Sequence, residues 1–340
     1  MKRTVLLFVA IIMVFCQPVF SNVWRVNNTL DTDAAQKLFK TLQEAHDAPA
    51  VAAGDTLLVE GSSIVHPSIE ISKRLVIIGT GYLLTSNPQT QFNPAMSIVS
   101  KITIKPAAAG TILVGLTFAN NNSSFAPYIE ADNVIVMRCY LNSNLYFNGD
   151  VNNVQIIQNY FEGATVTYGS SADRFTNIVL KNNVIAGNVS ISSSPTIQRS
   201  FSVVENNIFL SNVTLTSTVF RNNILAYNNA SVSISSSTIQ NNLALKAGVL
   251  PAGNGNQTYV AANLFVGATG TSEDGQYKLK DNSPYLTAGF GGTQPGIFGG
   301  TMPYVLSGMP PIPAIYELIA DGFGSKQNGL QVTIKAKANQ

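Results

Sequence analysis

The segment Leu180-Lys181-Asn182-Asn183-Val184 is one copy of a motif that recurs along the chain and indicates its fold. Each variant contains an apolar residue, a polar residue, a pair that is usually Asn-Asn, and a second apolar residue. The third position of the six variants falls at residues 139, 159, 182, 206, 222 and 241, which gives steps of 20, 23, 24, 16 and 19 residues. A repeat of about 20 residues that varies in length while it keeps its motif predicts a solenoid with one coil per copy.

A second set of short alternating segments follows the motif, with matching spacings of 21, 23, 24 and 19 residues. These segments are Leu145/Phe147, Val166/Tyr168, Val189/Ile191, Val213/Leu215 and Val232/Ile234. Because neighbouring side chains of a strand point to opposite faces, the first motif position predicts an inward stack and the second an outward column. The expected inward stack is Met137, Ile157, Leu180, Val204, Phe220 and Ile239, and the expected outward column is Arg138, Gln158, Lys181, Glu205, Arg221 and Gln240.

The Asn pairs have two interpretations: a row that lines a ligand site, or a structural ladder of side-chain amides stacked from coil to coil. Asn also tolerates the left-handed backbone conformation that tight bends require. Cys139 stands at the first position, where a small buried residue can end a stack but makes a poor ligand for a sugar. We therefore predict a structural ladder formed by Cys139, Asn159, Asn182, Asn206, Asn222 and Asn241.

The N-terminus has the pattern of a signal peptide. Met1-Lys2-Arg3 is basic, and the apolar run at residues 5–15 is too short to span a bilayer. We expect residues 1–21 to be a signal peptide that is cleaved after Ser21. Phe15 is too large for the lipobox that a lipid anchor on Cys16 would need. We expect no membrane span elsewhere, and a mature protein that is secreted or held at the cell surface.

Residues 31–53 carry helix signals, with Thr41 as the expected N-cap and Glu44 reaching back to it in a capping box. An open end of a solenoid would expose its core and unpaired backbone groups, so this helix is the expected N-terminal plug. Strands are expected at residues 22–26, 56–59, 69–71, 75–78, 98–104 and 112–118.

Three segments of this region resemble the N-terminal cap and first coils of the pectate-lyase-like superfamily. They are Phe39-Lys40-Thr41-Leu42-Gln43-Glu44-Ala45, Gly54-Asp55-Thr56-Leu57-Leu58-Val59 and Lys73-Arg74-Leu75-Val76-Ile77-Ile78-Gly79. That superfamily includes pectin methylesterases and uncharacterised exported bacterial proteins. The resemblance implies an all-β, single-stranded right-handed parallel β-helix. With about ten coils spaced by roughly 4.8 Å, its column would be about 50 Å long.

The C-terminal part has a different composition. Ser283-Pro284 and the glycines up to Gly300 resemble the segment that closes the last coil of exported bacterial β-helix proteins. Residues 259–266 are a candidate last coil, residues 303–313 are rich in proline, and residues 330–336 alternate like a final strand laid on the body. We expect one domain at residues 22–300, the β-helix with its N-terminal cap, and a C-terminal extension at residues 301–340 packed on it.

Composition excludes some classes of function. The formal net charge is +2 and charged residues make up 11% of the chain, which argues against nucleic acid as a partner and gives no basic face for membranes. Only Cys139 remains after signal cleavage, so no intramolecular disulfide is expected. We expect a monomer without a cofactor.

Carboxylates bear on whether the protein is an enzyme. A calcium-dependent lyase needs several converging acidic oxygens, a hydrolase needs paired carboxylates in one groove, and the resemblance to pectin methylesterases implies two aspartates with an arginine. Between residues 131 and 272 the only acidic residues are Asp132, Asp150, Glu162, Asp173 and Glu205. No two of them occupy the same point of successive motifs, so the sequence supports no carbohydrate-active site.

Other candidate residues have plain structural interpretations. His46 and His66 stand in the expected cap and in an early turn, and two histidines alone do not make a metal site. Lys181, Glu205 and Arg221 alternate in charge on successive coils, where such pairs contribute about 0.2–1 kcal/mol each. Aromatic residues on outer faces can stack on sugars, and we expect Tyr140, Tyr146 and Tyr160 to form one patch that contacts glycans.

These observations favour an exported, non-catalytic protein that binds a polysaccharide, a cell-surface glycan or another partner through its outer faces. The alternative is a polysaccharide lyase, hydrolase or esterase of the same superfamily, which would need three or more carboxylates and a Lys or Arg in one groove. A homotrimeric, tailspike-like adhesin is the third hypothesis.

Overall fold

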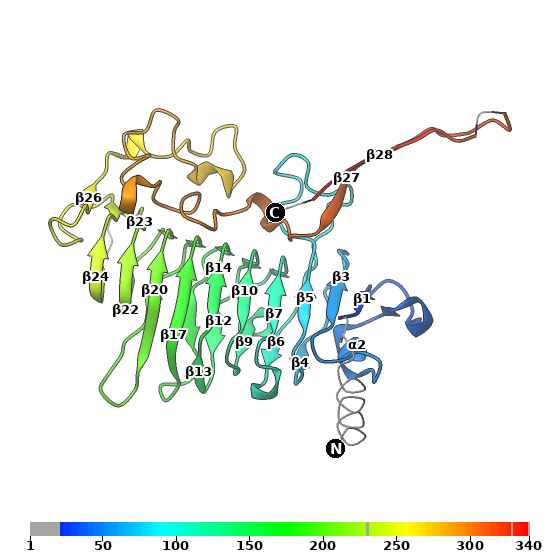
Figure 1. Ribbon diagram of the computed structural model, residues 1–340, viewed down its shortest axis with the longest axis horizontal. Coiled ribbons are helices and arrows are strands. Elements are labelled where there is room, and N and C mark those ends of the chain that lie inside the picture. The colour runs from blue at the N-terminus through cyan, green and yellow to red at the C-terminus, as the bar shows by residue number, and fades with distance from the viewer. Residues whose placement is uncertain (1–20, 229–230, 328, 339–340) are drawn as a thin grey trace, which may run out of the picture.

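The computed structural model describes residues 21–228, 231–327 and 329–338, so the predicted signal peptide lies outside the described residues apart from Ser21. In the described part, the chain is mostly β-structure, with one 13-stranded, one 8-stranded and one 5-stranded sheet (Figure 1). Strand pairs in these sheets are parallel and join successive coils. The chain is therefore all-β with large parallel sheets, as expected of a parallel solenoid.

The strands of the 13-stranded sheet are β1 (Val23–Val26), β2 (Leu38–Phe39), β3 (Thr56–Val59), β5 (Val76–Ile78), β7 (Ile112–Val114), β10 (Ile135–Met137), β13 (Asp150–Asn152), β14 (Gln155–Ile157), β17 (Arg174–Lys181), β19 (Val189–Ser190), β20 (Arg199–Glu205), β22 (Val213–Arg221) and β24 (Val232–Gln240). Those of the 8-stranded sheet are β8 (Thr117–Phe118), β11 (Tyr140–Leu141), β15 (Tyr160–Phe161), β18 (Val184–Ile185), β21 (Ile208–Phe209), β23 (Ile224–Leu225), β25 (Leu243–Ala244) and β26 (Gln257–Thr258). Those of the 5-stranded sheet are β4 (Ile69–Ile71), β6 (Ile102–Ile104), β9 (Pro127–Ile129), β12 (Leu145–Phe147) and β16 (Val166–Tyr168).

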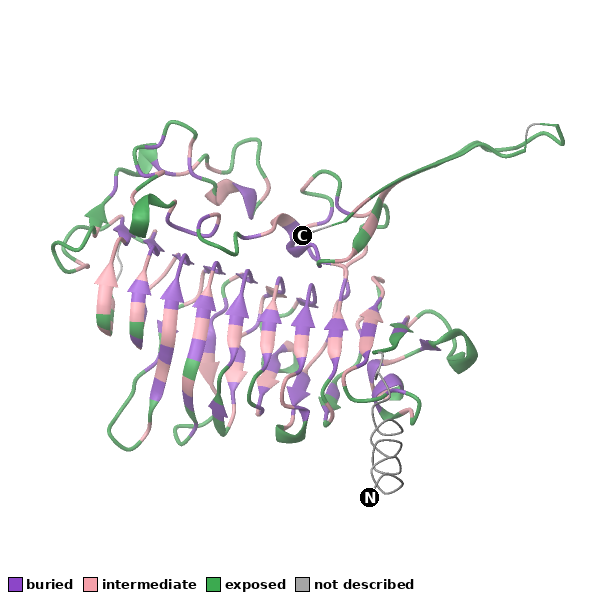
Figure 2. Ribbon diagram, viewed as in Figure 1, coloured by how far each residue is buried: buried purple, intermediate pink, exposed green. Residues whose placement is uncertain are grey.

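The core lies between the sheets, because the middle coils (β7–β9, β10–β12 and β14–β16) contribute one short strand to each sheet in turn. In the last coils the long strands β22 and β24 of the 13-stranded sheet take the place of a separate strand in the 5-stranded sheet. Apolar side chains alternate inward along these strands and form one continuous buried cluster from Trp24 to Ala244. Figure 2 shows the buried residues along the strands and the exposed ones mainly in the loops between them. The 3-10 helices are η1 (Ala34–Gln36), η2 (Pro106–Ala108), η3 (Ser123–Phe125), η4 (Ala261–Asn263), η5 (Gly275–Tyr277), η6 (Phe290–Gly292) and η7 (Leu306–Gly308).

The strand register corrects the predicted inward stack by one residue in its first two coils. Ile156 pairs with Leu180, and Ile157 pairs with Lys181, so Ile157 belongs to the outward column. Met137 pairs with Ile157 and is outward as well. The sequence misleads here because both coils carry two adjacent apolar residues before the turn. The observed inward stack is Val136, Ile156, Leu180, Val204, Phe220 and Ile239.

An asparagine ladder is present, but it uses the second residue of each Asn pair. Its members are Asn159, Asn183, Asn207, Asn223, Asn242 and Asn256, and Cys139 precedes them. In the middle of the ladder, the Asn207 side-chain amide donates to Asn223 Oδ1 at 3.0 Å and to the Leu180 carbonyl at 2.8 Å. Burial raises the pKa of the Cys139 thiol to about 12, so this end of the ladder is chemically inert.

The first residue of each pair makes the bend itself. Asn182, Asn206, Asn222 and Asn241 have φ between 53° and 57°, and Arg138 and Gln158 take the same left-handed conformation one residue before Cys139 and Asn159. The predicted ladder thus combined two columns of residues. Cys139 and Asn159 belong to the observed ladder, whereas the other four predicted members each stand one residue before a residue of the observed ladder. The structure separates the two tasks that an Asn pair performs, the backbone turn and the amide stack.

The N-terminal helix is shorter than the sequence signals predict. It is α2 (Leu42–Asp47), and Thr41 Oγ1 caps it by accepting from the Glu44 backbone N–H at 3.1 Å. The Glu44 carboxylate accepts from the Thr32 hydroxyl. Leu42 and Ala45 are buried, and the helix contacts β1, β2, β3 and β4.

The C-terminal part returns along the outside of the 8-stranded sheet. Residues 285–312, here called the return segment, hydrogen-bond to the left-handed residues of successive bends. Asn206 and Asn182 donate to carbonyls at Gly296 and Ile297, and Arg138 donates to Met309. A second apolar cluster is buried between the return segment and the sheet.

The two predicted elements at the C-terminus differ from expectation. Residues 264–266 form no strand of the solenoid, although Leu264 is buried and Phe265 makes one antiparallel bridge to Leu279. The predicted final strand is β28 (Val332–Ala338), which pairs antiparallel with β27 (Pro313–Ala320). This two-stranded hairpin, here called the arm, extends away from the sheets (Figure 1).

We predict that Asn207→Ala lowers the free energy of unfolding by about 1–3 kcal/mol, because it leaves the buried amide partners of neighbouring coils unsatisfied. The shift of the urea unfolding midpoint measures this effect. Asn177→Gly is the matched control, since Asn177 is exposed and Gly meets its φ of 61°. Equal shifts for the two variants would contradict a role for the ladder amide.

Candidate functional site

The predicted patch of three tyrosines is divided between two sheets. Tyr140 and Tyr160 stack on neighbouring coils of the 8-stranded sheet, with ring centroids 5.7 Å apart and an interplanar angle of 2°. Tyr160 is only 7% exposed, because it belongs to the cluster under the C-terminal part, and Tyr82 packs on both rings. Burial raises the pKa of both phenols. These two rings therefore serve packing.

Tyr146 stands apart from them, on the outer face of the 5-stranded sheet. It stacks on Tyr128 of the neighbouring coil, with centroids 4.6 Å apart and an interplanar angle of 10°. Lys101 Nζ lies 4.1 Å from the centroid of the Tyr128 ring, on which it makes a cation–π contact. Both tyrosines are half-buried. Sequence periodicity could not identify Tyr128, because it lies before the first Asn motif.

Register places Tyr146 between a large and a small neighbour. It pairs with Tyr128 on one side and with Thr167 on the other. Thr167 is much smaller than an aromatic ring. Tyr128 covers one face of the Tyr146 ring. The other face lies on the side of the small Thr167 side chain, which leaves room for a flat ligand to continue the stack.

Beyond Tyr146 the outward side chains are small and bear hydroxyls. Ser190, Thr214 and Ser233 are paired in register from coil to coil, and Thr216 pairs with Ser235 in the next outward position. We call the surface formed by Thr167, Ser190, Thr214, Thr216, Ser233 and Ser235 the hydroxyl face. All six residues are exposed or half-buried, and none is charged. Such a surface can hydrogen-bond to polar, uncharged groups.

An ion-pair network borders the aromatic stack. Lys105 Nζ lies 3.4 Å from a Glu70 carboxylate oxygen and 3.3 Å from one of Glu130. Asn148 donates to Glu130 Oε1 at 2.9 Å. Glu130 is thereby held by two neighbours beside Tyr128, so this carboxylate contributes to the scaffold around the stack.

The remaining predicted carboxylates do not converge on one site. Asp132, Asp150 and Arg174 line one groove together with Gln198. In this groove Arg174 Nη1 lies 3.7 Å from Asp150 Oδ2. Asp132 Oδ1 accepts from the Asn152 backbone N–H at 2.7 Å, and Asp173 accepts from the backbone N–H groups of Gly149 and Ser170. Glu162 accepts from the Tyr140 hydroxyl on another sheet. The groove thus holds two of the predicted acidic residues and one arginine.

Glu205 is the most strongly bound of these carboxylates. Lys181 Nζ lies 2.8 Å from its Oε2 and Arg221 Nε 2.6 Å from its Oε1, as the alternating charges predicted. Burial alone would raise the pKa of this carboxyl, but the hydrogen bonds and charges of Lys181 and Arg221 hold it below the ordinary value. Arg221 also lies over the Phe290 ring, so the ion pairs extend to the return segment.

The histidines have structural partners. His46 Nε2 accepts from the Ser72 backbone N–H at 3.0 Å, and His66 is fully buried with its Nε2 3.2 Å from the Glu60 carbonyl. Burial lowers the pKa of His66. Among the described residues, no three His, Cys, Asp or Glu side chains lie close enough together to hold a metal ion.

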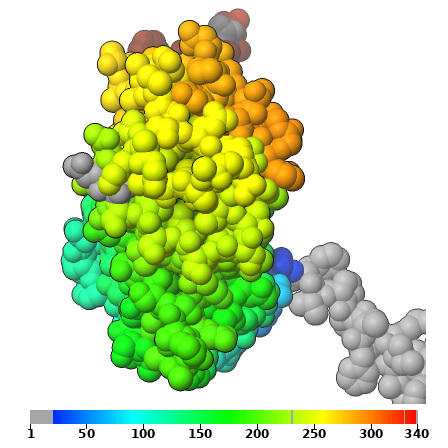
Figure 3. Space-filling model, turned by 90° about the vertical axis from the view of Figure 1, so that its left-hand side faces the viewer, coloured from blue at the N-terminus to red at the C-terminus, as the bar shows by residue number. Residues whose placement is uncertain are grey.

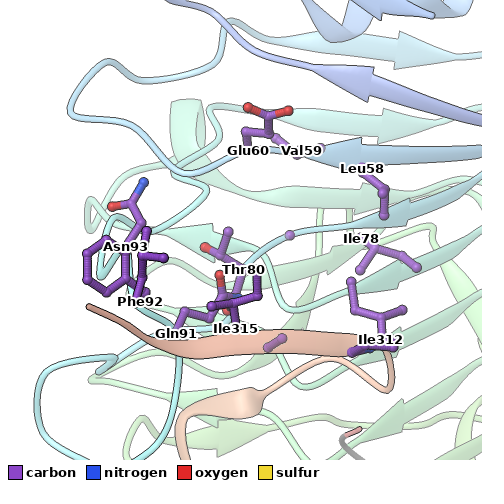
Figure 4. A pocket seen from close by; sticks show the side chains of 14 residues that line it. Leu58, Val59, Glu60, Ile78, Thr80, Gln91, Phe92, Asn93, Ile312 and Ile315 are labelled. Carbon is purple, nitrogen blue, oxygen red and sulfur yellow. The ribbon is translucent and has the colours of Figure 1, made fainter. Parts of the chain in front are cut away.

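An apolar groove of about 430 Å³ lies where the arm leaves the body. Leu58 and Ile78 of the 13-stranded sheet border it on one side, and Ile312 and Ile315 on the other (Figure 4). The Phe92 backbone N–H donates to the Ile315 carbonyl at 2.8 Å. The groove is therefore part of the attachment of the arm.

No protein-family model matches this chain, and no curated protein matches it either. In the part of the chain that the structure describes, no helix has the length and apolar character needed to cross a membrane.

We predict that Glu205→Gln destabilises the protein at pH 7 and that the difference from wild type shrinks as the pH falls below the ordinary pKa of glutamate. A carboxyl with a lowered folded-state pKa stabilises the fold above its unfolded-state pKa, and that contribution is lost as the pH falls through the folded-state pKa. Urea midpoints across a pH series measure the difference. Asp281→Asn, at an exposed residue, is the control. A difference that stays constant with pH would contradict the assignment.

Proposed function

We propose that this protein is a non-catalytic, exported β-helix protein that binds neutral glycans along an outer surface that runs from Tyr146 of the 5-stranded sheet onto strands β19, β22 and β24 of the 13-stranded sheet. The observation that carries the proposal is the Tyr128–Tyr146 stack, which leaves one face of Tyr146 above Thr167 at the start of the hydroxyl face. Aromatic rings bury large apolar surfaces at low entropic cost, and a sugar ring stacked on Tyr146 would use that surface. Its hydroxyls would then exchange hydrogen bonds with serine and threonine side chains.

The charge pattern supports a neutral ligand. The hydroxyl face carries no charged side chain, and nearby Lys105 is shared by Glu70 and Glu130, which leaves this group with a net charge of about −1 and no cation for an acidic ligand. A polyanionic polysaccharide would need several free cations along its path. Lys101 is already placed over the Tyr128 ring. We therefore propose an uncharged polysaccharide or cell-surface glycan as the ligand.

We also propose that the three parallel sheets belong to a single right-handed β-helix of the pectate-lyase-like superfamily. The parallel pairing of successive coils in all three sheets and the Asn bends support this assignment. In this proposal α2 plugs the N-terminal end, which the burial of Leu42 and Ala45 supports. The Gly- and Pro-rich return segment does not form the expected cap: it runs along the 8-stranded sheet, and Val249 and Leu250 pack against part of the other end.

Export remains a proposal that rests on the sequence of residues 1–21. When the full chain is expressed in an export-competent bacterium, N-terminal sequencing of the exported protein should begin at Asn22. An uncleaved N-terminus on protein that stays inside the cell would contradict export by a signal peptide.

The alternative function is an esterase or hydrolase acting on a pectin-like polysaccharide. Its supporting observation is the groove that holds Asp132, Asp150 and Arg174 together. The two carboxylates already hold structural partners, Asn152 and Arg174, which favours the binding function. Release of methanol or of shortened chains from pectin-like substrates, abolished by Asp150→Ala, would establish this alternative and contradict a non-catalytic protein.

We predict that Tyr146→Ala weakens binding to neutral polysaccharides at least about tenfold, which corresponds to about 1.4 kcal/mol. Affinity electrophoresis against a panel of neutral and acidic polysaccharides measures the effect. Tyr227→Ala is the matched control, because Tyr227 is 38% exposed and lies outside the candidate site. Retardation that is the same for wild type and Tyr146→Ala would contradict the proposed site.

A further inference from the structure

The arm has one entirely apolar face. Leu318 pairs with Ile334, Ala320 with Val332, and a bulge after Ile315 brings Ile315 opposite Ala336 on the same side. The other face is more polar: it carries the Glu317–Lys335 ion pair and Thr333, together with the Thr333 partner Ile319. Ile315 is 48% exposed and Ile334 is 58% exposed. An isolated two-stranded hairpin is marginally stable in water, so an amphipathic arm of this kind needs a surface that covers its apolar face.

A free sheet edge lies at the opposite end of the molecule. Among the described strands, β24 pairs only with β22; on its other edge the Ile239 carbonyl accepts from the Asn256 side chain, and the part from Val232 to Ser236 has no strand partner. In the preceding coils, inward-facing residues donate their backbone N–H to the next coil: Val189 to Asn212, Ile191 to Thr214, and Val213 to Ser231. By the same register, the N–H groups of Val232 and Ile234 point away from β22, toward a position where the described residues place no further strand.

The core is also incompletely covered at this end. Val213, Leu215 and Phe220 of β22 are buried, whereas their partners Val232, Ile234 and Ile239 of β24 are half-buried. Val249 and Leu250 pack against part of this end. Figure 3 looks onto it, where the last coils and the loops after them form the facing surface. Natural edge strands usually carry charges or proline against pairing, but the nine residues of β24 contain neither.

We propose that the arm of one molecule pairs with the free edge of β24 in a second copy of this chain. The arm strands have eight and seven residues and β24 has nine, so their lengths match. The added strands would continue the 13-stranded sheet, with Ile334, Val332 and Leu318 on the same side of the sheet as the half-buried residues of β24. This mode is β-strand addition, in which backbone hydrogen bonds supply affinity and apolar alternation sets the register.

The geometry argues for a second copy and against closure within one molecule. The arm leaves the body beside β3 and β5, and β24 lies at the other end of the row of strands (Figure 1). The hydrogen bond from Phe92 to Ile315 and the apolar groove fix the base of the arm (Figure 4). Contact between different patches on the two copies is head-to-tail and generates open chains of molecules. In this proposal, the monomer that the sequence analysis expects is the state of the protein when these chains have dissociated.

The first test is sedimentation velocity of the mature chain over a wide concentration series. Wild type should associate into species larger than dimers. Ile334→Lys should weaken association at least about tenfold by placing a charge on the apolar face of the arm. Thr333→Lys, on the opposite face, is the matched control and should associate like wild type. A wild type that stays monomeric throughout, or equal losses for the two variants, would overturn the proposal.

The second test distinguishes head-to-tail contact from any other association. Ile234→Pro removes the N–H that faces the free edge while keeping the bonds to β22. If this variant fails to fold, Ile234→Lys replaces it. Each single variant should be monomeric, because one lacks a working arm and the other a working edge. An equimolar mixture of Ile334→Lys and Ile234→Pro should form one-to-one dimers and nothing larger. A mixture that stays monomeric would overturn the proposal.

Discussion

The buried side-chain amides of the ladder determine how the coils from Cys139 to Asn256 stack. A buried amide costs free energy unless its donors and acceptor find partners, and here each Asn finds them in the coils above and below. Asn207, for example, accepts from Asn183, donates to Asn223 and donates to the Leu180 carbonyl. In the coils from Cys139 to Asn256, this requirement fixes the position of the bend and lets the loops elsewhere vary in length. The same bend forces the preceding residue into the left-handed conformation and turns its side chain toward the return segment.

Local repetition made the parallel solenoid predictable, and its failures have physical causes. The Asn motifs and the alternating segments predicted the strands and their succession, because each coil meets the same neighbours. The register slipped where Val136-Met137 and Ile156-Ile157 offer two apolar residues for one inward position. The fate of Tyr160 could not be predicted, since residues far away in sequence and without periodicity cover it. Tyr128 could not be predicted either, because it lies before the first Asn motif. Nothing in the sequence shows that it stacks on Tyr146.

Acidic residues in this chain are mostly engaged in holding it together. Asp173 accepts backbone N–H groups at a turn, Glu205 joins two cations, and Glu162 accepts from a tyrosine hydroxyl. The candidate glycan site does not depend on acidic residues. It depends on shape, because the small Thr167 side chain lies beside the large Tyr146 ring. Sites of this type leave little trace in a single sequence, since Ser and Thr are common on any exposed strand.

The return segment has a consequence for how such a protein can change in evolution. It meets the bends in reverse order, with Ala288 bound to Asn241, Gly296 to Asn206, Pro303 to Gln158 and Met309 to Arg138. Stacked coils alone would permit a duplicated coil at almost any point, because each coil contacts only its neighbours. Here an inserted coil would shift every later bend by one strand spacing and put the return segment out of step. The length of the return segment therefore matches the number of coils that it contacts. If a coil is gained or lost, the part of the gene that encodes the return segment must change in length as well.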